Sequence, residues 1–134
     1  MSKTAAELYP QHGEEGFLGI YDYSPILEAL GNVVVRVDDD DYQGDSRVLY
    51  QDGERIGYLQ FGWGSCSGCD ALQACSTIDE VQDLMDSLQN GVKWFEDKTT
   101  ALDWFRTHDW AGDYSYHQEE QAEFVEKAIK FLSA

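Results

Sequence analysis

The cysteines are the residues whose type and spacing point most directly to chemistry. Three thiols lie close together in the chain, the first two within a glycine-rich turn: Cys66, Cys69 and Cys75. A Cys-x2-Cys pair in such a turn suits tetrahedral binding of zinc by thiolates. Because no second Cys-x-x-Cys pair follows, a fourth ligand would have to be Asp70, His108 or His117. The sequence therefore suggests a zinc site with Cys66, Cys69, Cys75 and His117 as its candidate ligands.

The same cysteines allow two other interpretations. A strand, a Cys-x-x-Cys turn and a helix-like stretch together resemble a redox dithiol at a helix start. However, a hairpin precedes them, where a thioredoxin-like fold needs a βαβ unit. Free cysteines also behave as small apolar residues and are often buried. We favour this structural role and keep a thiol-dependent enzyme as an alternative, because Cys and His partners can meet in space alone.

Carboxylates on two predicted helices form a second candidate set. Several lie beyond the first helical turn, where the helix dipole no longer favours them, and like-charge pairs at i,i+4 cost on the order of 0.2–0.5 kcal/mol each. Carboxylates about 6 Å apart along a helix resemble the regular row of phosphates along a nucleic-acid strand. A solvated surface is the simpler explanation. We nevertheless predict that these side chains bind a basic partner: Asp79, Asp83, Asp86, Glu119, Glu123 and Glu126.

A run of four aspartates is the third candidate, and it comprises Asp38, Asp39, Asp40 and Asp41. An EF-hand calcium loop that begins at Asp39 needs glutamate at its twelfth position, where this chain has Tyr50. We therefore expect a solvated loop that keeps an edge strand from pairing with other chains. The same run is expected to form a second acidic patch for the basic partner.

Aromatic side chains with polar tips gather in the segment 104–117, next to two histidines. Such side chains form the hot spots of protein interfaces or line ligand pockets. Packing of a loop onto the core is the commoner explanation. The candidate residues of an aromatic interface or pocket are Trp63, Trp110, Tyr114 and Tyr116.

Local signals predict the elements that carry these residues. Ser24 and Pro25 begin a helix that ends near Gly31. Thr77 and Glu80 form a capping box that begins a second helix. Helices are expected near 24–31, 77–90, 100–107 and 118–132.

β-branched and alternating residues predict the strands. Asp52-Gly53 is a strong hairpin signal between two of them. Strands are expected over 32–37, 47–51 and 54–61, with a short fourth strand over 92–95. The predicted fold class is α+β, with a three- to four-stranded antiparallel meander packed against about three helices. We expect a single domain over residues 1–134, in which residues 1–23 form an irregular N-terminal arm.

The charge of the chain narrows its possible partners. Its 9 basic and 26 acidic residues give a net charge of −17, with 12 acidic residues in positions 1–67 and 14 in positions 68–134. Such a surface repels nucleic acid and anionic membranes and attracts basic partners. No apolar run approaches the roughly 18 residues of a membrane span, and no apolar signal segment follows Met1. We therefore expect a cytoplasmic protein that binds neither nucleic acid nor membrane directly.

Four features between Gly57 and Leu132 carry a resemblance. They are the glycine- and cysteine-rich run at 62–72, the Trp-Phe pair at 94–95, and the segments 108–110 and 114–117. These features resemble a set of small, uncharacterised acidic proteins of tailed bacteriophages. The resemblance implies a phage origin and the cytoplasm of an infected bacterial host. Because small acidic phage proteins include nucleic-acid mimics and inhibitors of host defence enzymes, it also favours an inhibitor.

The chain lacks the nucleophile-elbow, Walker, dinucleotide-binding and His-Glu-x-x-His motifs, so we do not expect an enzyme. The sequence predicts a non-enzymatic acidic binding protein, a phage accessory factor that inhibits a basic host protein by charge mimicry. A defence nuclease or another nucleic-acid-binding protein would be such a partner. One alternative is a small-molecule- or zinc-binding domain that uses the Cys66–Cys69 turn and the aromatic segment. A thiol-dependent enzyme is the other alternative, and otherwise no cofactor is expected.

Overall fold

The computed structural model describes residues 3–10, 18, 20–65, 70–113 and 117–134. Helices and strands alternate irregularly along these ranges. They are α1 (Ala5–Leu8), α2 (Ser24–Leu30), β1 (Asn32–Asp38), β2 (Gly44–Asp52), β3 (Arg55–Trp63), α3 (Ile78–Asn90), β4 (Lys93–Phe95), α4 (Lys98–Thr107), the 3-10 turn η1 (Trp110–Gly112) and α5 (Gln118–Leu132).

The four strands form one antiparallel sheet in the order β1-β2-β3-β4. This arrangement confirms the predicted α+β class and the meander. β2 and β3 are longer than predicted because their pairing continues from Asp52↔Arg55 to Gly44↔Trp63. The hairpin loop is Gly53-Glu54, one residue later than predicted, and Gly53 has φ +60°. Glycine at the first loop position with positive φ fits a type II′ turn, which matches the twist of the strands.

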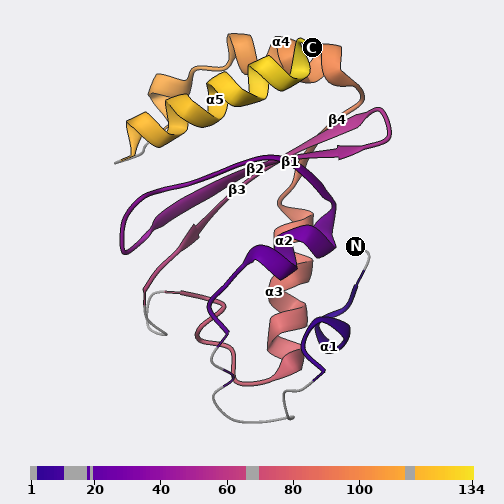
Figure 1. The fold of residues 1–134 in the computed structure, drawn as a ribbon, viewed down its shortest axis with the longest axis vertical. Helices are drawn as coiled ribbons and strands as arrows, with labels where there is room; N and C mark the ends of the chain where they lie inside the picture. The colour runs from indigo at the N-terminus through magenta and orange to yellow at the C-terminus, as the bar shows by residue number, and fades with distance from the viewer. Residues whose placement is uncertain (1–2, 11–17, 19, 66–69, 114–116) are drawn as a thin grey trace.

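Helices cover both faces of the sheet. Figure 1 shows α4 and α5 on one side of the strands and α1, α2 and α3 on the other. Because side chains alternate along a strand, Val48 and Tyr50 of β2 pack into the layer of α1, α2 and α3, whereas Leu49 packs against α4 and α5. β2 is therefore buried on both faces.

The helix boundaries follow local capping. The Thr77 hydroxyl accepts from the Glu80 backbone N–H, and the Glu80 carboxylate accepts from the Thr77 N–H, which confirms the predicted capping box. α4 begins at Lys98, before the predicted start, because the Asp97 carboxylate accepts from the Thr100 N–H. Within the described ranges no helix is both long and apolar enough to cross a bilayer.

The described part of the N-terminal segment contains one short helix and packs onto the core. Thr4 and Glu7 form a capping box for α1, and Ala5 is completely buried and donates its N–H to Gln82 of α3 at 2.7 Å. Leu18 and Ile20 are buried in the same core layer. The sequence analysis did not predict α1, although Thr-x-x-Glu at 4–7 is the pattern of a capping box.

Loss of the α3 capping box should destabilise the domain. We expect Thr77→Ala to lower the free energy of unfolding by about 1 kcal/mol, because the N–H groups of the first turn lose an acceptor. Urea unfolding, monitored by circular dichroism, measures this change in the free energy of unfolding. Ser87→Ala is the matched control, since Ser87 is exposed within the same helix and alanine favours helix there. Equal losses in both variants would contradict the role of the cap.

Candidate functional site

A buried ion pair organises one end of the sheet. Arg47 of β2 is 0% exposed, and its Nη1 lies 2.7 Å from Oδ1 of Asp39, whose side chain is also 0% exposed. The other carboxylate oxygen of Asp39 accepts from the Asp45 N–H at 2.8 Å. A Cβ at Gly44 would lie 2.7 Å from Asp39 Oδ2, so the close approach of the loop requires glycine there.

The prediction that Asp39 belongs to an exposed acidic patch is therefore wrong. A buried guanidinium is very unfavourable unless a carboxylate compensates its charge. Asp39 provides that compensation, and it cannot meet a partner at the surface. The neighbouring Asp40 and Asp41 are exposed, as predicted.

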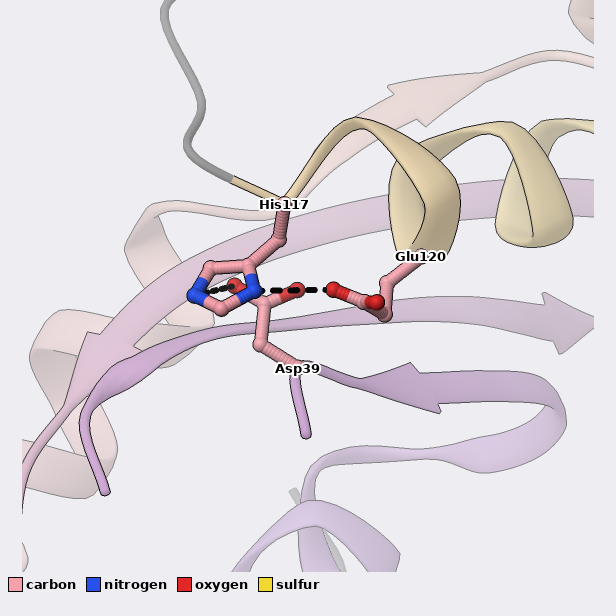
Figure 2. A group of neighbouring side chains, drawn as sticks. All are labelled: Asp39, His117 and Glu120. Atoms are coloured by element: carbon pink, nitrogen blue, oxygen red, sulfur yellow. Dashed lines mark ion pairs between the residues drawn. The ribbon is translucent and has the colours of Figure 1, made fainter. Parts of the chain in front are cut away.

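A histidine at the start of α5 joins this pair to further carboxylates. Nδ1 of His117 lies 2.9 Å from Oε2 of Glu120, and Nε2 lies 3.4 Å from Oδ2 of Asp41 and 3.9 Å from Oδ2 of Asp39. Figure 2 shows the Asp39 and Glu120 side chains beside the imidazole, with dashed lines for its ion pairs to both. The His117 side chain is only 18% exposed. The β1–β2 loop and the beginning of α5 are thus held together by charged and polar groups.

Asp38 is partly committed to interactions within the fold. Its Oδ1 accepts from Arg36 Nε at 2.9 Å and from the Ser46 hydroxyl at 2.6 Å. Its side chain remains 44% exposed. The aspartate run is therefore not one uniform patch, because its members differ in burial and in partners.

The two predicted rows of helical carboxylates lie on opposite sides of the sheet. Figure 1 places α3 on one side and α5 on the other. The row Asp79, Asp83 and Asp86 is exposed on α3, which contains no Lys or Arg. The row on α5, Glu119, Glu123 and Glu126, is also exposed. A single basic groove therefore cannot contact both rows at once, because the two rows do not form one continuous surface.

The two rows also differ in whether nearby basic side chains compensate their negative charge. Glu123 pairs with Lys127 at 3.0 Å, and Lys130 lies in the last turn of the same helix. Among the described residues, no ion pair joins a carboxylate of α3 to a basic side chain. The negative charge on α3 is therefore the less compensated of the two.

Cys66 and Cys69 lie outside the described residues, whereas Cys75 is described and buried. The Cys75 thiol donates to the Ala71 carbonyl at 3.3 Å. Burial, and then the charges of Glu80, Asp70 and Asp83, raise the pKa of this thiol. Cys75 belongs to the core layer of α1, α2 and α3, whereas His117 begins α5 in the other layer.

The predicted metal ligands Cys75 and His117 are therefore not brought together. The described group of potential ligand atoms around His117 contains carboxylates and no cysteine. The raised pKa of Cys75 also means that little of its thiol is the reactive thiolate near neutral pH. Cys75 thus fits the structural role that the sequence analysis favoured.

The two predicted aromatic residues that the structure describes, Trp63 and Trp110, do not line one pocket. Trp110 packs against Trp104 and Phe105 on the side of α4 and α5, and its Nε1 donates to the Phe105 carbonyl at 2.8 Å. Trp63 packs in the opposite layer and donates to the Ser46 hydroxyl at 2.9 Å. Tyr114 and Tyr116 lie outside the described residues. Loop packing onto the core accounts for Trp110.

Trp63 does line an open cavity of about 440 Å³. Buried Asp70 also lines it, and its carboxylate accepts from the Tyr23 hydroxyl at 2.5 Å and from the Leu72 N–H at 3.1 Å. Burial is the main cause that raises the pKa of Tyr23. These polar groups bond to one another, so they position the chain that follows β3.

Sequence reasoning missed Arg47 and Glu120 as members of a site. The signal for Arg47 was an arginine directly before Val48, Leu49 and Tyr50 in a strand, close to a run of aspartates. Glu120 resembled an ordinary first-turn glutamate, and no local pattern pairs it with His117.

Comparisons with protein-family models, with curated proteins and with solved structures find no match to this chain.

Breaking the buried ion pair should be strongly destabilising. We expect Asp39→Asn to lower the free energy of unfolding by about 3–5 kcal/mol, because the Arg47 charge stays buried without a compensating carboxylate. Chemical denaturation measures the loss. Asp40→Asn makes the same change at the next, exposed position and should alter stability by less than about 0.5 kcal/mol. Similar losses in both variants would show that the pair is not special.

The Cys75 thiol should react slowly in the folded protein. We expect alkylation by iodoacetamide at pH 8 to be at least about tenfold slower in native than in urea-unfolded protein, because burial and nearby carboxylates raise its pKa. Peptide mass spectrometry separates Cys75 from the other two cysteines. Equally fast modification of Cys75 in both states would contradict the structural role.

Proposed function

We propose that this protein is a non-enzymatic acidic binding protein whose α3 surface binds a basic partner. The observation that carries the proposal is the row of exposed carboxylates on a helix without any Lys or Arg. Uncompensated carboxylates on an ordered helix present a fixed negative surface, and like charges in that arrangement slightly destabilise the helix. A partner that supplies basic side chains removes this repulsion.

The spacing on α3 supports a nucleic-acid-binding protein as the class of partner. Asp79, Asp83 and Asp86 follow one another at i, i+4 and i+7, which puts them on one helix face. Over these seven residues the helix rises by about 10 Å. A basic groove that accepts a row of phosphates could accept this row of carboxylates instead.

The net charge of −17 supports the same mechanism at long range. A strongly negative protein attracts a basic partner and accelerates their encounter, and salt weakens this attraction. Charged residues at the rim of an interface mainly affect the association rate and its salt dependence. Binding should therefore weaken steeply as salt increases.

The resemblance to small phage proteins supports a host-directed role. In this proposal the protein acts in the cytoplasm of an infected bacterium and blocks a basic host protein, such as a defence nuclease. Occupation of the groove that normally holds nucleic acid would inhibit the enzyme without any catalysis by this chain.

The test compares two variants of equal net charge. The first is Asp79→Asn, Asp83→Asn, Asp86→Asn on α3, and the second is Glu119→Gln, Glu123→Gln, Glu126→Gln on α5. The wild type and both variants are immobilised and exposed to bacterial lysate at about 50 and about 500 mM NaCl. The retained proteins are then identified. We expect basic proteins to be retained at low salt by the wild type and the α5 variant and to be lost with the α3 variant.

The retained protein is then purified and mixed with labelled DNA or RNA. We expect the wild type to displace the nucleic acid, and the α3 variant to need at least about tenfold more protein, as removal of three charge contacts implies. Circular dichroism checks that both variants remain folded. Equal losses in the two variants would mean that only net charge matters, and retention that is indifferent to salt would refute charge-driven binding.

A further inference from the structure

We propose that Asp39, His117 and Glu120, with Asp41 at the solvent side, form a binding site for a divalent transition-metal cation. This site lies between the β1–β2 loop and the start of α5, and Figure 2 shows its three central side chains. It is separate from α3, which lies on the other side of the sheet (Figure 1). The proposal therefore does not depend on the proposed function.

The potential ligand atoms lie close enough together to surround one ion. One potential ligand atom from each of Asp39, His117 and Glu120 lies within 4.8 Å of the other two. Metal–ligand distances of about 2.0–2.2 Å put the ligands of one tetrahedral ion roughly 3.3 Å apart. Nε2 of His117 is already 3.4 Å from Asp41 Oδ2 and 3.9 Å from Asp39 Oδ2. Because one ion binds a single ring nitrogen, side-chain rotation would have to place one atom of each residue around it.

One carboxylate oxygen of the site is buried without a well-formed hydrogen bond. Oε2 of Glu120 is inaccessible to solvent and accepts no hydrogen bond from any described residue, although it lies 2.9 Å from Nδ1 of His117. The contact is therefore close but not aligned for donation. A buried charged oxygen without a donor is unfavourable. A bound cation would provide the missing interaction.

The charged groups around His117 are mainly negative. Three carboxylates, those of Asp39, Asp41 and Glu120, lie around His117, and Arg47 is the permanent cation that pairs with Asp39. Apart from the imidazole, these groups together carry a formal charge of −2, which one divalent cation would balance. Carboxylates held together at low solvent exposure repel one another, so the cation also relieves that repulsion.

The chemistry of the ligand set selects the type of metal. Imidazole with carboxylates suits Zn²⁺ or Mn²⁺, whereas Ca²⁺ and Mg²⁺ prefer ligand sets made only of oxygen. The ion can reach the site from solvent, because the side chains of His117, Glu120 and Asp41 are 18%, 22% and 45% exposed. The fixed position of Asp39 against Arg47 gives the site one preorganised ligand.

The test uses isothermal titration calorimetry with ZnCl₂ and MnCl₂ on chelator-treated protein in about 150 mM NaCl. The protein carries Cys66→Ser and Cys69→Ser, so that these thiols cannot contribute. We expect one site per chain and at least tenfold weaker binding in His117→Gln and in Glu120→Gln. Asp39 is not substituted, because its loss would remove the carboxylate that pairs with the buried Arg47 side chain and would destabilise the fold.

The matched control is Glu119→Gln, which makes the same charge change on the adjacent, exposed residue. We expect its affinity to equal that of the parent. A second measurement follows the NMR signals of the His117 imidazole while Zn²⁺ is added. These signals must shift if the ring binds the ion. Equal weakening in all three variants, equal binding of Ca²⁺, or unchanged His117 signals would each overturn the proposal.

Discussion

The buried pair of Arg47 and Asp39 is the interaction on which one half of this structure depends. Arg47 lies on a strand that is covered on both faces, so its charge has no access to water and needs a carboxylate beside it. Asp39 meets it at 2.7 Å and also bonds to the Asp45 backbone. The loop after β1 is folded back by these bonds, which brings Asp41 within 3.4 Å of His117.

The second constraint is the position of the sheet between two helical layers. Because α3 and α5 pack on opposite faces, the acidity of the chain is divided among environments with different chemistry. On α3 the exposed carboxylates form no ion pair with any basic side chain that the structure describes. On α5 one of them, Glu123, is paired with Lys127. At the beginning of α5, Glu120 turns toward a histidine. The net charge of the chain is therefore divided between an exposed row of carboxylates on α3 and a cluster of carboxylates around His117.

Local signals predicted most elements because their causes lie within a few residues. The Thr77–Glu80 capping box and the apolar periodicity of α5 needed no distant partner, and both helices begin where the pattern indicated. The predicted bounds were wrong where a capping residue was overlooked or where pairing with a distant segment extended a strand. Asp97 capped α4 earlier than expected. β2 and β3 continued to Gly44 and Trp63 because each strand stabilises the other.

The sequence by itself determined the net charge, the α+β class and the exposed carboxylates of α3, since composition, caps and periodicity are properties of short stretches. Only the tertiary structure decided that Asp39 is internal, that Cys75 and His117 lie in different layers, and that His117 meets Glu120 and Asp41. These outcomes depend on which face of the sheet each helix covers. That choice is made by packing between residues far apart in the chain, and no local pattern encodes it.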